Sequence, residues 1–253
     1  MTELSIKALS GVPIIKAGDN LNQIIDDALQ QNAVALQTGD VLVISSKIVS
    51  KAEGRFVDLN TVQPDERARE VAESTGKDPR IVALVLAEST GISRQARGVL
   101  VTQHRLGFIS ANAGIDQSNV KDAPDWVLLL PEDPDASASA IRDHIRRALG
   151  VQVGVVISDS HGRPFRMGNI GVAIGTAGLP SLVDLRGQKD LFGRELAISL
   201  QGYGDLIASA AHLVCGEGDE GLPLVLVRGL SYPPTEHSTA RDLNRPPEKD
   251  LYR

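Results

Sequence analysis

The chain has 253 residues, of which 42% are hydrophobic, 3% aromatic and 23% charged, and its formal net charge is −6. This composition is typical of a globular protein rather than a disordered or fibrous one. The longest apolar runs, such as LPLVLV at 222–227, are far shorter than the roughly 20 residues that span a bilayer. No basic region followed by an apolar stretch opens the sequence, so no secretory signal is expected. We therefore expect a cytoplasmic protein with no membrane partner.

Cysteine count and charge exclude further classes. Cys215 is the single cysteine, which excludes an internal disulfide and a cysteine-rich zinc site. The mild acidity and the scarcity of aromatic residues argue against nucleic acid as a partner. The length suggests one large domain or two tightly joined ones, at about 150 residues per domain. We expect residues 1–230 to form this folded unit, and residues 231–253, rich in Pro, Thr, Glu, Arg and Asp, to form a polar tail.

In the first half of the chain, hydrophobic patterning predicts several short elements. The apolar run 41–44 follows a Gly-Asp turn and indicates a buried strand. Residues 64–76 have proline early, acids in the first turn and glycine at the end, which is typical of a helix. A shorter helix is expected at 78–88. Residues 98–110 resemble a hairpin, with two β-branched runs around a polar centre, and 127–130 form another apolar strand.

The clearest helix is predicted over residues 135–149. Ser137 is expected to cap its start and Gly150 to end it. Its apolar face is predicted to contain Ile141, Ile145, Ala148 and Leu149.

The second half of the chain again mixes strands and helices. A strand is predicted at 151–158 with Asp159 at its carboxyl end, and the glycine-rich run 170–178 has some strand character. A helix is expected at 205–214, ending at Gly216, followed by a buried strand at 222–227. Because strands and helices do not alternate strictly, we predict an α+β fold with mixed, largely antiparallel sheets and packed helices, rather than a doubly wound one.

Two polar segments are candidate sites. In residues 112–119, Asp116 and Asn119 offer oxygen ligands, although the same residue types form turns for purely local reasons. After the strand at 151–158, Asp159 and Ser160 offer the hard oxygen donors that Mg²⁺ and Mn²⁺ prefer. Arg163 and Arg166 could bind phosphate or carboxylate. The alternative for this second segment is an exposed turn with solvated charges.

Two further segments could bind phosphates. Residues 216–221 match G-x-G-x-x-G, but they follow a predicted helix and precede a strand, the reverse of a dinucleotide-binding motif. Their three carboxylates would repel phosphate unless a divalent cation, held by Glu217, lay between the carboxylates and the phosphate. The alternative interpretation of this segment is a solvated acidic turn. Hydroxyls and lysines at 45–51 follow a strand, yet no Walker motif is present. The five histidines lack metal-ligand spacing, and Cys215 is expected to be a buried structural thiol.

Taken in order, these segments resemble the GTP-dependent coenzyme F420-0:L-glutamate ligases, also called F420-0 gamma-glutamyl ligases. The resemblance rests on GVPII at 11–15, GDVLV at 39–43, SKIVSKAEG at 46–54, NAGIDQSN at 112–119, DSHGR at 159–163, GQKDL at 187–191 and GEG at 216–218. It covers most of residues 1–230 in order. The fold that it implies is an unusual α+β one that forms an intertwined homodimer.

The resemblance also implies the site residues. Nucleotide contacts are implied at Val12, Pro13, Ile14, Ile15, Ser46, Lys47, Lys51, Asn119, Gly216, Glu217, Gly218, Asp219, Glu220 and Gly221. Two divalent cations, Mg²⁺ or Mn²⁺, are implied at Asp116, Asp159, Ser160 and Glu217. K⁺ is a further candidate cofactor. Catalytic roles are then expected for Asp116, Asp159, Lys51 and Arg163.

The implied reaction is amide formation between F420-0 and L-glutamate. The terminal carboxylate of F420-0 would attack the γ-phosphate of GTP to give an acyl phosphate, and the glutamate amine would then displace phosphate. Further γ-linked glutamates could follow. Two alternatives stay open, a metal-dependent nucleotidyltransferase and a non-catalytic nucleotide-binding protein.

Overall fold

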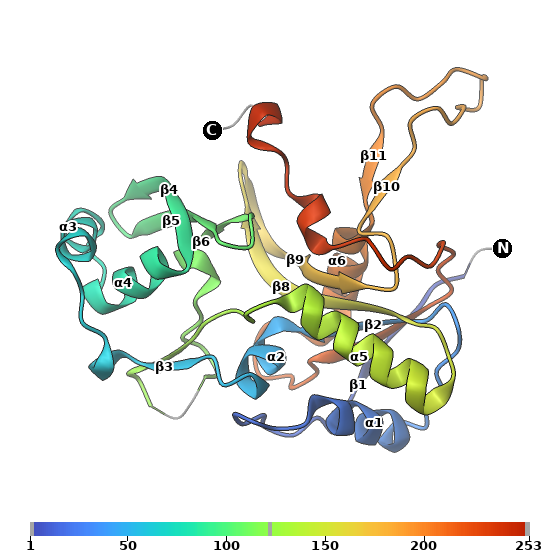
Figure 1. Cartoon of the computed structure of the whole chain (residues 1–253), viewed down its shortest axis with the longest axis horizontal. Coiled ribbons are helices and arrows are strands. Elements are labelled where there is room, and N and C mark those ends of the chain that lie inside the picture. Colours follow the sequence, from blue (N-terminus) through green and yellow to red (C-terminus); the bar gives the residue numbers. More distant parts are fainter. Residues whose placement is uncertain (1–2, 121–122, 251–253) are drawn as a thin grey trace.

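The computed structural model describes residues 3–120 and 123–250, and its body is built on a five-stranded mixed sheet (Figure 1). The order of its strands is β1 (Ser5–Leu9), β12 (Leu224–Arg228), β2 (Val41–Ser45), β8 (Gly154–Arg163) and β9 (Arg166–Ala177). Only β2 and β8 run parallel; the other neighbours are antiparallel. This arrangement confirms the expected α+β class and places the carboxyl ends of β2 and β8 side by side.

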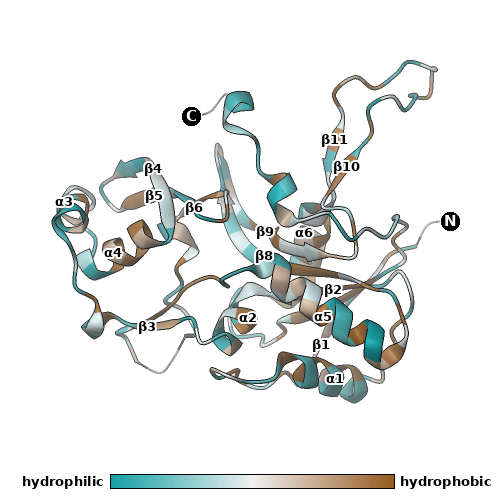
Figure 2. Cartoon of the chain, in the orientation of Figure 1, coloured by the Kyte–Doolittle hydropathy of each residue, from teal (hydrophilic) through white to brown (hydrophobic). Residues whose placement is uncertain are grey.

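Helices cover both faces of this sheet, so its central strands are buried on both sides. Val41, Leu42, Val43 and Ile44 of β2 are all buried, as the continuous apolar run predicts. One face packs against α1 (Leu21–Gln31), α2 (Ser46–Ala52) and α5 (Pro134–Leu149). The other packs against α6 (Tyr203–Cys215). Hydrophilic residues lie on the outer sides of α1 and α5 (Figure 2).

A smaller lobe stands beside the body, on the left in Figure 1. It contains α3 (Glu66–Thr75), α4 (Pro79–Ala87) and a three-stranded antiparallel sheet of β4 (Ser89–Ala96), β5 (Val99–His104) and β6 (Ile109–Ala111). The lobe has a separate hydrophobic core, which includes Ala68, Val71, Val82, Val85 and Leu100. The pair β3 (Phe56–Asp58) and β7 (Trp126–Leu128) joins the lobe to the body.

Two other segments extend from the body. The ribbon of β10 (Leu182–Asp184) and β11 (Leu200–Gly202) carries a long loop away from the sheet (Figure 1). The described part of the segment after β12 packs on the body through η3 (Ala240–Leu243) and continues to η4 (Pro247–Lys249). The remaining short helices are η1 (Leu59–Thr61) and η2 (Asn112–Gly114). Among the described residues, no helix is long and apolar enough to cross a membrane.

Three local predictions were wrong. Asp159 does not end its strand, because β8 continues to Arg163 by pairing with β9. Ser137 does not cap α5. The N-cap is Asp133, which directly precedes Pro134, the first residue of the helix, and whose side chain accepts from the Ala136 amide at 3.0 Å. Ala148 and Leu149 are exposed, since the last turn of α5 extends beyond the sheet that buries Ile141 and Ile145.

Candidate active site

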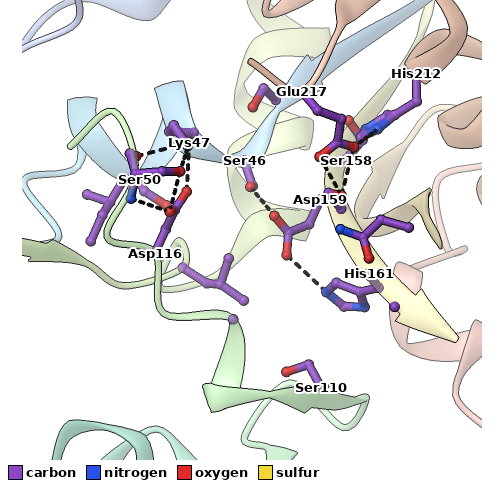
Figure 3. Close-up of a pocket in the computed structure, with 18 of the residues that line it drawn as sticks. Ser46, Lys47, Ser50, Ser110, Asp116, Ser158, Asp159, His161, His212 and Glu217 are labelled. Atoms are coloured by element: carbon purple, nitrogen blue, oxygen red, sulfur yellow. Dashed lines mark hydrogen bonds and ion pairs between the residues drawn. The ribbon is translucent and has the colours of Figure 1, made fainter. Parts of the chain in front are cut away.

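A cavity of about 1790 Å³ lies where the body meets the lobe. Its walls come from the β2–α2 junction, the 109–120 segment, the β8–β9 hairpin and the loop after α6. Figure 3 shows the polar side chains that face it. Segments far apart in the sequence therefore supply one site.

The parallel pairing of β2 and β8 builds the first part of this site. Ser45 and Ser158 are register partners, so the residues that follow them, Ser46 and Asp159, lie side by side. Ser46 Oγ donates to Asp159 Oδ1 at 2.9 Å (Figure 3). Carboxyl ends of neighbouring parallel strands are a common place for ligand binding in α/β sheets.

His161 holds the other oxygen of Asp159. The two residues share one face of β8 because they are two positions apart, and His161 Nε2 lies 2.9 Å from Asp159 Oδ2. The His161 ring lies against Phe108, which stacks on the buried His104. Aromatic packing and a hydrogen bond therefore fix the orientation of Asp159.

Glu217 lies next to this pair, on the loop that follows α6. Ser160 Oγ lies 2.8 and 2.9 Å from its two carboxylate oxygens, and His212 Nδ1 lies 3.3 Å from Oε1. His212 can approach β9 because residue 171 is glycine: a Cβ there would lie 2.4 Å from His212 Cδ2. The site therefore depends on a close approach of α6 to the sheet.

Asp116 faces the cavity from the opposite side and forms an ion pair with Lys47. Lys47 Nζ lies 2.7 Å from Asp116 Oδ2, and the Ser118 amide and hydroxyl donate to Oδ1. Burial by itself raises the pKa of Asp116, but the hydrogen bonds from Lys47 and Ser118 outweigh it and hold the pKa below its usual value. Asp116 therefore stays ionised, and its negative charge is paired with the positive charge of Lys47.

Lys51 and Asn119 connect this side to the acidic loop. Lys51 Nζ donates to the Asn119 carbonyl at 2.6 Å, and Asn119 Nδ2 donates to the Gly218 carbonyl at 3.1 Å. Burial, with the nearby charge of Lys47, lowers the pKa of Lys51. These contacts join α2, the 112–119 segment and the 216–221 loop into one wall.

Comparison with known proteins places the chain in a family. The family model described as F420-0:Gamma-glutamyl ligase matches residues 11–229. The chain belongs to this family. It is 46% identical over 94% of its length to a coenzyme F420:L-glutamate ligase of Methanopyrus kandleri, covering 93% of that protein. It is 42% identical to the Methanothermobacter thermautotrophicus ligase over 99% of both chains, and 46% identical to the Halorubrum lacusprofundi ligase over 90% of this chain and 88% of the other.

All the site residues that the family resemblance implies line the one cavity. From the segments before the lobe these are Val12, Pro13, Ile14, Ile15, Ser46, Lys47 and Lys51. From later segments they are Asp116, Asn119, Asp159, Ser160, Arg163 and Gly216 through Gly221. The loop position of 216–221, after a helix and before a strand, is as predicted. The individual roles of these residues stay predictions.

The donor chemistry of the site fits hard divalent cations of the kind the family resemblance implies. Asp159, Ser160 and Glu217 offer carboxylate and hydroxyl oxygens, which are the ligands that such ions prefer. Asp159 is hydrogen-bonded to Ser46 and His161, and Glu217 to Ser160 and His212. Asp116 lies across the cavity on Lys47. In the described part of the chain, no three His, Cys, Asp or Glu side chains lie close enough together to hold one ion without rearrangement.

Sequence reasoning missed His161 and His212. It set both aside because histidine spacing showed no metal-binding pattern, whereas each contacts a carboxylate from a different part of the fold. Extending the strand prediction through Arg163 would have placed His161 beside Asp159 on one face. Cys215, expected to be buried, is partly exposed at the cavity wall. Burial raises the pKa of its thiol, which disfavours the nucleophilic thiolate.

Proposed function

We propose that this chain forms an amide between the terminal carboxylate of F420-0 and the amine of L-glutamate, with GTP as co-substrate. The observation that carries the proposal is the match to the F420-0:gamma-glutamyl ligase family over residues 11–229. The cavity supports it, because one site holds acids for metal ions, lysines for phosphates and arginines for an acidic substrate.

In this proposal GTP lies along the wall made by α2 and the acidic loop. Lys47 and Lys51 supply positive charge near the phosphates, and the 216–221 loop brings backbone groups close to them. Val12, Pro13 and Ile14 offer an apolar surface for the base, and Ile14 is 84% exposed, whereas Ile15 is buried beneath them in the core. Asn119 keeps the loop in position through the Gly218 carbonyl.

Asp116, Asp159, Ser160 and Glu217 would hold two Mg²⁺ or Mn²⁺ ions, with K⁺ as a further candidate. When bound, such ions neutralise phosphate charge, which is the main requirement of phosphoryl transfer. Ser46 and His161 keep both oxygens of Asp159 directed into the site.

Two displacements complete the proposed reaction. A carboxylate oxygen of F420-0 bonds to the γ-phosphorus as the bond to GDP breaks, giving an acyl phosphate. The glutamate nitrogen then bonds to the acyl carbon, phosphate leaves, and the amine loses a proton. Lys51 offsets charge on the transferred group, and Arg163 with Arg166 binds the acidic substrate. The product ends in new carboxylates, so further γ-linked additions are chemically possible.

The proposed assembly is an intertwined homodimer. The β10–β11 ribbon leaves Leu191, Phe192 and Ile198 at least 88% exposed, an apolar surface that a second copy would cover. Sedimentation of the unaltered chain should give the dimer mass, and Phe192→Ser with Leu191→Ser should shift it to the monomer. A monomer before substitution would contradict this assembly.

Mass spectrometry of F420-0 after incubation with the protein, GTP, Mn²⁺ and L-glutamate tests the function. We expect the mass of F420-0 plus one or more glutamate residues, with one orthophosphate released per addition. Release of pyrophosphate would identify a nucleotidyltransferase instead. GTP binding without glutamate-dependent phosphate release would identify a non-catalytic nucleotide-binding protein.

A further inference from the structure

The segment after β12 contributes to the cavity, although the family model ends before it, at residue 229. Arg245 and Asp250 both line the cavity wall. Residues 231–253 were predicted to be a polar tail, and no motif in the sequence assigned them a role. The described part of this segment therefore reaches the candidate site.

Hydrogen bonds attach this segment firmly to the body. The Ser181 amide donates to Ser238 Oγ at 2.7 Å, and the Ala240 amide donates to Asp135 Oδ1 at 2.9 Å. Ala240 is only 5% exposed, and Leu243 packs against the core that α6 covers. The approach of Arg245 to the cavity therefore follows from specific contacts within the chain.

Asn244 sets the position of Arg245. Its Nδ2 donates to the Leu106 carbonyl at 3.1 Å and lies only 2.7 Å from the position that a Cβ on residue 107 would take, so glycine there allows the approach. Pro246 then restricts the backbone of Arg245 to extended conformations. The backbone of Arg245 is thus positioned before any ligand arrives, which lowers the entropy cost of bringing its side chain to the cavity.

Arg245 shares the cavity with two arginines of the β8–β9 hairpin. Arg163 and Arg166, from the β8–β9 hairpin, line the same cavity. Arg163 Nη2 donates to the Met167 carbonyl and Arg245 Nη1 to the Lys249 carbonyl, at 3.1 and 3.5 Å. Both acceptors are neutral backbone carbonyls, so these two hydrogen bonds do not themselves neutralise either guanidinium.

The C-terminal segment is separate from α2, which carries the lysines proposed for GTP. η3 packs on β9, and in Figure 1 the C-terminal segment rises beside the β8–β9 hairpin, well away from α2, which carries Lys47 and Lys51. Basic side chains from two separate parts of the fold thus line one cavity. An enzyme that joins a nucleotide to an acidic coenzyme needs basic side chains for both.

We propose that Arg245 binds an anionic group of the coenzyme substrate and so makes the C-terminal segment part of the substrate site. This proposal rests on the proposed function. A guanidinium suits the task because it can donate two parallel hydrogen bonds to a carboxylate or phosphate. The segment's docking on Leu106 and Asp135 sets where that group is held.

Calorimetric titration of F420-0 into the unaltered chain, Arg245→Gln, Arg245→Lys and Lys249→Gln tests this role. Lys249 is the matched control, since it is exposed on the same segment but does not line the cavity. We expect Arg245→Gln to raise the Kd for F420-0 about tenfold, Arg245→Lys to recover part of the loss, and Lys249→Gln to change it less than about twofold. The Kd for GTP should be unchanged in all four, and melting temperatures should agree because both side chains are exposed.

An unchanged Kd for F420-0 in Arg245→Gln would overturn the proposal, as would an equal loss in Lys249→Gln or a matching rise in the Kd for GTP. These comparisons measure binding and need no turnover. If F420-0 binds as expected but no glutamate is added, the proposed function fails while the role of Arg245 stands.

Discussion

The two sides of the cavity are stabilised in different ways. On the body side, Asp159 and Ser160 extend from the central sheet, whose β2 and β8 strands are buried between helices. On the lobe side, the 109–119 segment reaches the cavity from a separate, smaller core and is tied to the body by polar contacts such as Lys47–Asp116. Packing therefore fixes one half of the site, whereas charge pairs and hydrogen bonds fix the other.

The largest effect is expected on the body side, from Asp159→Asn. The amide keeps the shape of the side chain but removes the charge that would hold a cation, so kcat should fall roughly a thousandfold. Thermal unfolding should be nearly unchanged, because Ser46 can still donate to the remaining carbonyl oxygen. Asp143→Asn, on the outer surface of α5, is the matched control and should keep full activity. Near-normal turnover of Asp159→Asn would contradict the metal assignment.

On the lobe side, the largest effect is expected on stability rather than chemistry. Glu88 follows α4 and accepts from Arg55 at 3.0 Å and from Arg105 at 3.0 Å, which links the lobe to the chain around α2. Burial raises the pKa of Glu88, but His104, Arg55 and Arg105 together lower it to about 2. Glu88→Gln should cost about 3 kcal/mol of unfolding free energy in urea at neutral pH. Glu70→Gln, in an exposed pair on α3, should cost well under about 1 kcal/mol.

The same carboxylate predicts a pH dependence. Because the folded pKa of Glu88 lies below its ordinary value of 4.5, its contribution is complete above 4.5 and is lost as the pH falls toward about 2. Unfolding free energies of the unaltered chain and Glu88→Gln should converge over that range. A difference that stays constant with pH would show that Glu88 is not held as an ion.

Local sequence signals predicted single elements on both sides of the cavity, including the helices α3 and α4 and the β5–β6 hairpin of the lobe. The apolar run of β2 and the helix–loop–strand order around 216–221 were correct, since each follows from neighbouring residues alone. α2 was missed because its seven residues, SKIVSKA, carry no side-chain cap; burial of Ile48 and Val49 holds it. The extension of β8 through polar residues depends on pairing with β9, which the apolar pattern of residues 151–158 does not indicate. The Lys47–Asp116 pair likewise requires the whole fold.

The smallest effect should come from one contact that joins the two sides. Asn119 has φ of 52°, in the left-handed region that glycine tolerates, and only its side chain reaches the Gly218 carbonyl. Asn119→Gly therefore removes that hydrogen bond while Lys51 keeps the backbone carbonyl as its acceptor. An exposed hydrogen bond contributes about 1 kcal/mol, so the KM for GTP should rise about fivefold with kcat nearly unchanged. Asn60→Gly, on the exposed η1 turn, controls for added backbone freedom and should leave KM unaltered. A fall in kcat with constant KM would mean that the acidic loop acts in the chemical step rather than in holding the nucleotide.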